Sequence, residues 1–262
     1  MATPNVLVLR APGTNCDQET AYAFELAGAK ATRLHVNQLI ENPSLANNYQ
    51  ILCFPGGFSY GDDIAAGRIL ATQIHTFLSD MLEMFKQENR LVLGICNGFQ
   101  IMMRLGIFFD SVDPATPPAT LTWNRQGRFE DRWVHLKPAS DRCIFLKGIE
   151  RAYYPMAHAE GRFLFRDAAA REQLVANGQI ALQYCTAEGA TGDQPLAHPD
   201  NPNGAEMNVA GICDTSGRIF GLMPHPERHL FPTNHPHWTR REVQPEHGEG
   251  LQLFQNAVEY FS

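Results

Sequence analysis

The stretch from Leu91 to Gly106, LVLGICNGFQIMMRLG, constrains the fold more than any other part of the sequence. Its first five residues form a short apolar run that is typical of a buried parallel strand. From Asn97 to Leu105 the apolar residues recur at helical spacing, and Gly106 marks the expected end of the helix. The pattern therefore predicts a strand that turns sharply into a helix, with Cys96 at the turn.

Cys96 is the strongest candidate for a nucleophile. Gly94 and Gly98 flank it in a G-x-C-x-G pattern, the thiol counterpart of the G-x-S-x-G elbow. Residues without a Cβ let strand and helix pass closely, so the turn pushes the thiol outward. The positive end of the helix dipole favours the reactive thiolate. The alternative interpretation is a buried structural cysteine between two packing glycines.

Strands and helices alternate through the first hundred residues. Strands are expected over 5–10, 31–36, 51–54 and 91–95, and helices over 17–26, 62–70, 72–86 and 97–105. This alternation predicts an α/β fold with a right-handed, mostly parallel, flavodoxin-like sheet flanked by helices. Function is then expected at the carboxyl ends of the strands.

After Gly106 the pattern becomes that of an antiparallel addition. Short alternating segments lie at 120–123, 133–136 and 162–165, a hairpin is expected from 209–213 and 218–222, a further strand at 180–185, and helices at 168–176 and 251–261. The stretches near 187–206 and 229–247 have no periodicity. Because there is no repeat or low-complexity linker, we expect a single domain over 1–262, with insertions at those two stretches.

Composition excludes several classes of function. The net charge of −7 and the lack of a Lys or Arg block argue against a nucleic-acid surface. The apolar runs are too short for a membrane span, and Met1 to Asn5 has no signal-peptide character, so a cytoplasmic protein is expected. No C-x-x-C pair suggests a zinc site or a disulfide framework. The cysteines other than Cys96 are predicted to be core or loop residues: Cys16, Cys53, Cys143, Cys185 and Cys213.

A thiol nucleophile needs a base, and His225 is the best candidate. It lies in Met223-Pro224-His225-Pro226-Glu227-Arg228, just beyond the second hairpin strand. The flanking prolines hold this segment extended. Residues two apart in an extended segment point to the same side, so Glu227 is expected beside His225 as its orienting carboxylate. A histidine in a simple proline-rich turn is the alternative.

Acyl chemistry also needs donors for an oxyanion. Pro55-Gly56-Gly57 ends the third strand, next to the fourth-strand turn if the two strands are neighbours. We expect the backbone N–H of Gly57 to join that of Asn97 in an oxyanion hole. A plain turn at Gly56-Gly57 is the other interpretation.

Two competing motifs are less favoured. Ser59 lies in a formal G-x-S-x-G match, but the predicted strand stops at Phe54 and does not run into the serine. The run of His229, His235 and His237 is interrupted by prolines and has no nearby carboxylate pair, so a solvated loop is expected there in place of a metal site. No P-loop motif is present, and no metal ligand set is predicted.

The motifs GICNGFQ at 94–100 and PHPER at 224–228 together resemble the class I, or triad, glutamine amidotransferases. Within that family the chain is similar to the glutaminase subunits of phosphoribosylformylglycinamidine synthases, which act in purine biosynthesis. This closer resemblance is based on APGTNCD at 11–17, GGFSYGD at 56–62, HAEGRF at 158–163 and NPNG at 201–204. The matching motifs extend from the start of the chain to Arg228.

The resemblance implies an activity, a set of site residues and partners. Cys96 would attack the glutamine side-chain amide, His225 would move protons, and Glu227 would orient His225. Phe58 and Gln100 are implied as glutamine contacts. The chain itself would hold no cofactor; ATP and Mg²⁺ would belong to a separate synthetase subunit that receives the ammonia, and a small third subunit is also implied.

The sequence departs from the compact members of this family at three places. Residues 229–247 separate the PHPER motif from the last helix, the loop at 187–206 is long, and Ala159 stands where glycine is more usual. Two other hypotheses remain open at this point. One is a cysteine peptidase or chaperone of the related thiol-elbow α/β group; the other is a non-catalytic partner protein in which Cys96 is merely packed.

Overall fold

The computed structural model describes residues 3–110 and 116–262, so Met1 and Ala2 of the N-terminal segment considered above lie outside it. The strands are β1 Asn5–Arg10, β2 Lys30–His35, β3 Ile51–Phe54, β4 Leu91–Ile95, β5 Ala119–Trp123, β6 Glu130–Pro138, β7 Ala152–His158, β8 Glu160–Phe165, β9 Ile180–Cys185, β10 Val209–Cys213 and β11 Ile219–Leu222. The α-helices are α1 Asp17–Leu26, α2 Val36–Glu41, α3 Arg68–Phe77, α4 Ser79–Gln87, α5 Asn97–Leu105, α6 Ala168–Ala176 and α7 Leu251–Glu259.

Nine strands form one sheet in the order β2-β1-β3-β4-β11-β10-β9-β6-β7. The first five are parallel to one another, and the remaining pairings, from β11–β10 onward, are antiparallel. The parallel order β2-β1-β3-β4-β11 is that of a flavodoxin-like sheet. The predicted α/β class, the parallel sheet and its antiparallel addition are therefore confirmed, and β5 and β8 form a separate antiparallel pair.

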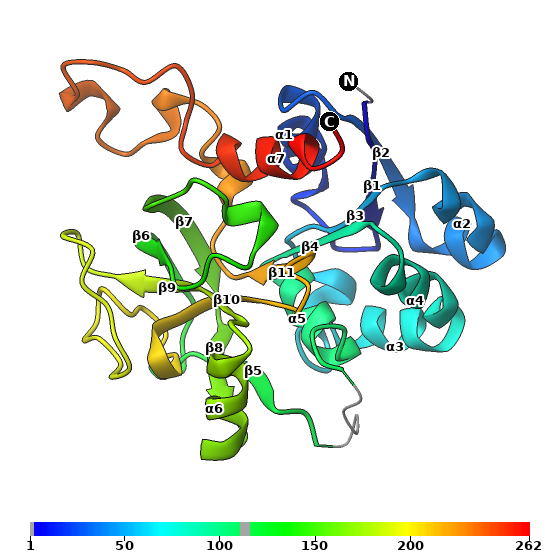
Figure 1. Ribbon diagram of the computed structural model, residues 1–262, viewed down its shortest axis with the longest axis horizontal. Helices are drawn as coiled ribbons and strands as arrows, with labels where there is room; N and C mark the ends of the chain where they lie inside the picture. The colour runs from blue at the N-terminus through cyan, green and yellow to red at the C-terminus, as the bar shows by residue number, and fades with distance from the viewer. Residues whose placement is uncertain (1–2, 111–115) are drawn as a thin grey trace.

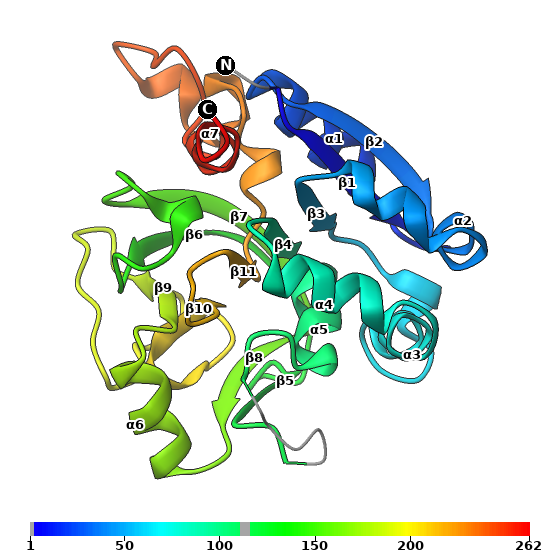
Figure 2. The same ribbon diagram turned by 45° about the vertical axis from the view of Figure 1, so that its right-hand side comes forward.

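Helices cover both faces of the sheet. Figures 1 and 2 show α1 and α7 together on one side and α3, α4 and α5 on the other. Phe24 of α1 packs edge-to-face on Phe254 of α7, with ring centroids 4.9 Å apart. The central strands β3 and β4 are buried along their whole length, as expected for apolar strands covered on both faces.

Two predicted helices have different bounds, because the chain takes tight turns where helix was expected. The prediction of 62–70 and 72–86 is wrong: the helices are α3, Arg68–Phe77, and α4, Ser79–Gln87. Residues Ser59–Asp62 form a 3-10 turn that contains Gly61 at positive φ. Gly67, also at positive φ, immediately precedes α3. Strand β7 was not predicted, because Pro155 lies inside it; this proline is tolerated because β7 is at the edge of the sheet.

The loop that contains His229, His235 and His237 is only partly solvated. His229 is fully buried and His235 is nearly so, while His237 is exposed. The rings of His229 and His235 lie against Trp133 of β6, with centroids 5.1 and 5.9 Å from it. The expectation of a solvated loop is therefore wrong for two of the three histidines, since the aromatic side chains of β6 and β7 cover them.

Across residues 3–110 and 116–262, none of the helices combines the length and the apolar character that crossing a membrane requires.

Candidate active site

Cys96 occupies the predicted turn between β4 and α5. Its backbone is at φ 52° and ψ −105°, a conformation that non-glycine residues rarely adopt. A Cβ at Gly94 would lie 2.3 Å from Sδ of Met102, and a Cβ at Gly98 would lie 1.8 Å from the carbonyl oxygen of Phe54. The two glycines are thus required by the close passage of strand and helix, as predicted.

His225 lies just beyond the end of β11, the strand that pairs with β4. Its backbone N–H donates to the carbonyl oxygen of Pro155 on β7 at 2.8 Å. Its Nδ1 is 2.5 Å from Oε1 of Glu227, and both side chains are buried. The pairing is as predicted, but Glu227 lies in the 3-10 turn Pro226–Arg228 and not in an extended segment.

The structure brings the thiol of Cys96 to this imidazole. The thiol of Cys96 lies near enough to His225 to act on its charge, and its Sγ is 3.8 Å from the carbonyl oxygen of Ala157. Burial by itself would lower the pKa of His225, but the Glu227 carboxylate and the thiol of Cys96 raise that pKa well above its ordinary value. The protonated imidazole is therefore stabilised beside the sulfur.

Gly57 follows β3, which pairs directly with β4. The prediction of an oxyanion hole required these two strands to be neighbours, and they are. Its φ of +139° is outside the usual range for a residue with a side chain, and a Cβ there would lie 2.7 Å from the backbone nitrogen of Asn15. Asn97 is the first residue of α5, where backbone N–H groups have no partner within the helix. The assignment of Gly57 and Asn97 as oxyanion donors stays a prediction.

The side chains of Asn97 and Gln100 hold loops in place around the elbow. Oδ1 of Asn97 accepts from the N–H of Ser59 at 3.1 Å, and its Nδ2 donates to Oε1 of Gln100 at 3.0 Å. Nε2 of Gln100 donates to the carbonyl oxygen of Glu160. Gln100 is therefore engaged at both ends of its amide, whereas Phe58 is 44% exposed. Both remain predicted glutamine contacts.

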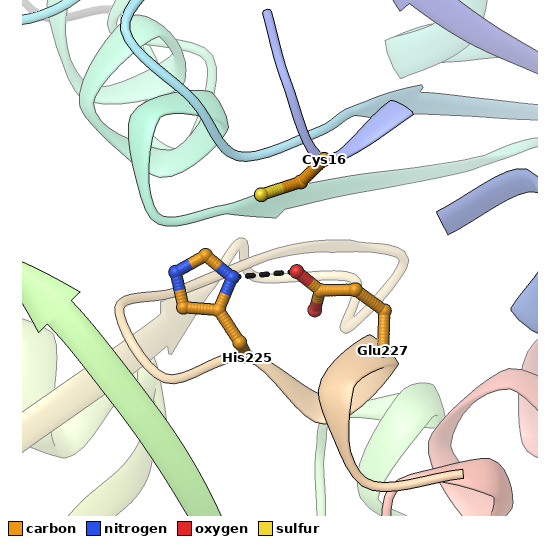
Figure 3. A group of neighbouring side chains, drawn as sticks. All are labelled: Cys16, His225 and Glu227. Carbon is orange, nitrogen blue, oxygen red and sulfur yellow. Dashed lines mark hydrogen bonds and ion pairs between the residues drawn. The ribbon is translucent and has the colours of Figure 1, made fainter. Parts of the chain in front are cut away.

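Sequence reasoning missed Cys16, which was expected to be a simple core or loop residue. Its buried thiol lies beside the imidazole of His225 and the carboxylate of Glu227 (Figure 3). Nη2 of Arg228 approaches its sulfur to 3.4 Å. Burial raises the pKa of the Cys16 thiol, and the neighbouring His225 imidazole opposes that effect. The sequence signal that could have identified Cys16 as a site residue is its position. It follows the carboxyl end of β1, and function is expected at the carboxyl ends of the parallel strands.

The competing serine is not at an elbow. Ser59 begins a 3-10 turn beyond the end of β3, and its hydroxyl has no hydrogen-bond partner among the described residues.

A cavity of about 620 Å³ opens on the other side of Gln100, between α3, α4, α5 and β5. Among the described residues its lining includes Gln100 and Glu160 but neither Cys96 nor His225, so the thiol site is separate from it.

Comparison with known proteins gives one consistent set of matches. Residues 3–261 match the family model described as the CobB/CobQ-like glutamine amidotransferase domain. A Methanococcus maripaludis protein named phosphoribosylformylglycinamidine synthase subunit PurQ is 45% identical over 271 residues, which cover 99% of this chain and 98% of that protein. A Dehalococcoides mccartyi protein of the same name is 44% identical over 262 residues, with 99% and 98% coverage. In the structure of PurLQS from Thermotoga maritima, a chain aligns over the full length of both chains with a TM-score of 0.73 and 26% identity.

Proposed function

The chain belongs to the CobB/CobQ-like glutamine amidotransferase family, and we propose that it is the glutaminase subunit of a phosphoribosylformylglycinamidine synthase. The relatives that carry this name match it over nearly their whole length. The observation that carries the proposal is that His225, bonded to Glu227, lies beside the elbow thiol of Cys96, at the ends of the paired strands β11 and β4. A cysteine peptidase or chaperone of the thiol-elbow group is not favoured, because these relatives are amidotransferase subunits.

The geometry supports amide hydrolysis through a thioester. His225 takes the thiol proton of Cys96, and the sulfur attacks the side-chain amide carbon of glutamine. The imidazolium then protonates the amide nitrogen, which leaves as ammonia. Water attacks the thioester while His225 takes one of its protons, and glutamate leaves as the thiol is restored. Glu227 keeps the His225 ring oriented and stabilises its charged form throughout the reaction.

The two tetrahedral intermediates each carry a negative oxygen. In our proposal this oxygen accepts hydrogen bonds from the backbone N–H groups of Gly57 and Asn97. Both groups belong to backbone that is fixed by close contacts, at Gly57 by the 13–15 loop and at Asn97 by the first turn of α5. Phe58 and Gln100 are proposed to contact the bound glutamine.

The ammonia is proposed to pass to a separate synthetase subunit that uses ATP and Mg²⁺, with a small third subunit in the same cytoplasmic complex. The match to a chain of a PurLQS structure supports a synthetase partner. The chain itself is proposed to be a single amidotransferase domain that needs no cofactor for glutamine hydrolysis, because its triad supplies the nucleophile, the base and the orienting carboxylate.

A glutaminase assay with the synthetase subunit present tests the function. Cys96→Ala should lower ammonia release by more than about 10⁴-fold, because covalent catalysis is lost. A glutamine-analogue alkylator should label Cys96 of the wild-type chain, located by peptide mass spectrometry. Cys185→Ala is the matched control, because Cys185 is equally buried but lies in β9, outside the site. Substantial ammonia release by Cys96→Ala, or labelling at another cysteine, would refute the assignment.

A further inference from the structure

Three potential metal ligands meet at the triad: His225 and Glu227 belong to it, and Cys16 has no part in the proposed reaction. Ligand atoms of Cys16, His225 and Glu227 all lie within 4.8 Å of one another, and all three residues are buried. Cys16 precedes α1, while the other two follow β11. Figure 3 shows the sulfur of Cys16 above the imidazole ring, on the opposite side of the ring from its Cβ. Two segments far apart in the sequence therefore present their donors to one point.

These donors suit a particular class of ion. A thiolate sulfur, an imidazole nitrogen and a carboxylate oxygen are the usual ligands of Zn²⁺, whereas Mg²⁺ and Ca²⁺ prefer oxygen alone. Bond lengths of about 2.0–2.3 Å to a tetrahedral zinc place its ligand atoms about 3.3–3.7 Å apart. The three ligand atoms lie within 4.8 Å of one another, so the sulfur would move towards the other two, while Nδ1 of His225 and Oε1 of Glu227, now 2.5 Å apart, would have to separate.

Glu227 has a free oxygen for such an ion. Its Oε1 is bonded to Nδ1 of His225, but its buried Oε2 has no hydrogen-bond partner among the described residues. A buried carboxylate oxygen without a partner is costly, and a cation is the ligand that would satisfy it. In Figure 3 this second oxygen points away from Cys16, so the carboxylate would have to turn to present it to an ion bound between the sulfur and the ring.

Gly56 leaves the space between the sulfur and the ring open. A Cβ at this position would lie 2.8 Å from Cε1 of His225 and 3.2 Å from Sγ of Cys16. Any other residue would therefore fill the gap between these two ligands. Gly56 is not forced to be glycine by a positive φ, so the crowding itself accounts for its lack of a side chain.

We propose that Cys16, His225 and Glu227 form an inhibitory binding site for Zn²⁺ or a similar borderline-soft divalent ion. As the ion binds, the thiol proton of Cys16 and the extra proton of the His225 imidazolium both leave to solvent, so that Cys16 binds as a thiolate and His225 as a neutral imidazole. The bound imidazole can no longer accept the proton of Cys96. Metal binding depends on these side chains alone, whereas the inhibition rests on the proposed glutaminase function.

The test measures Zn²⁺ binding to the full-length Cys96→Ala chain by isothermal titration calorimetry. This background removes the nucleophilic thiol, so binding there cannot be attributed to it, and the result does not depend on glutaminase activity. One ion per chain is expected. Cys96→Ala/Cys16→Ser should weaken binding by more than about 100-fold, because one of three ligands is lost. Cys96→Ala/Cys185→Ser should bind like its parent.

A second measurement covers the case in which the Cys16 variant does not fold. Co²⁺ bound to Cys96→Ala should give a thiolate-to-cobalt charge-transfer band, which requires a sulfur ligand and therefore identifies a cysteine site. Equal Zn²⁺ affinity with and without Cys16, no binding by Cys96→Ala, or a cobalt complex without this band would overturn the proposal. If binding is found but Zn²⁺ does not slow ammonia release by the wild-type chain, the inhibitory role is overturned and the binding site stands.

Discussion

The elbow at Gly94–Gly98 and the segment Met223–His229 contribute the two halves of the catalytic pair, but they are shaped by different forces. At the elbow, the position of Cys96 follows from backbone contacts between β3, β4 and α5, which only glycines allow. At the other segment, His225 is placed by groups far away in the sequence, among them the carbonyl oxygen of Pro155. The nucleophile is therefore positioned by local sterics, and the base by tertiary contacts.

This difference predicts that the elbow is the less tolerant of the two. Gly98→Ala should destabilise the protein by more than about 4 kcal/mol, because its Cβ would overlap the carbonyl oxygen of Phe54, which belongs to the backbone. Gly106→Ala is the control, since it also lies on α5, at its C-terminal cap, and has nothing within 4 Å. It should cost only about 1 kcal/mol, from its positive φ. Chemical denaturation of both variants measures the contrast, and equal midpoints would contradict the steric account.

In the segment Met223–His229, substitution of Glu227 should lower the catalytic rate more than it lowers the stability of the protein. Glu227→Gln keeps the shape of the side chain but removes the charge that is the main cause of the raised pKa of His225. The pKa of His225 should fall, and kcat should drop by about 10²–10⁴-fold, because the charged imidazole is no longer stabilised. Histidine NMR titration and the glutaminase assay measure the two effects.

Glu19→Gln is the matched control for this variant. Glu19 is partly exposed on α1 and forms an ion pair of 3.6 Å with Arg228, next to Glu227, but it is no hydrogen-bonding partner of His225. Its substitution should leave the titration of His225 and the rate close to those of the wild type. A Glu227→Gln enzyme with a normal rate and an unchanged His225 titration would mean that the carboxylate does not act through the imidazole.

The same contrast explains how much the sequence could predict. The elbow, helix α1 and strands β1, β3 and β4 were predicted at their observed positions, because their signals are local periodicity and glycine spacing. The pairing of His225 with Glu227 was also predicted, since it joins residues two apart. The amidotransferase family was identified from motifs at both segments, and the comparisons confirm it.

What the sequence did not predict depends on distant neighbours. Cys16 has no local pattern that separates it from a packed cysteine; only the meeting of the segments that follow β1 and β11 reveals its position. Strand β7 was missed because Pro155 argues against a strand until the edge position is known. The burial of His229 and His235 depends on Trp133 and its neighbours on β6 and β7, which lie far away in the sequence.

The smallest predicted effect concerns this histidine pair, which adjoins the catalytic segment. Burial first, and then Arg241, His229, His237 and His135, lower the pKa of His235 to about 4 from an ordinary value of 6.5. As the pH falls from about 6.5 to about 4, His235 therefore binds a proton in the unfolded chain but stays neutral in the folded chain. Unfolding is favoured over that window, and the free energy of unfolding should decrease.

His235→Gln should lessen this loss, because it removes one group that is protonated only after unfolding. Denaturant unfolding of the wild type and the variant at several pH values between 7 and 4 measures it. His75→Gln is the control, since His75 is exposed on α3 and its substitution should leave the pH dependence unchanged. If the curves of wild type and His235→Gln run parallel through this range, His235 binds its proton equally in the folded and the unfolded chain, and folding does not lower its pKa.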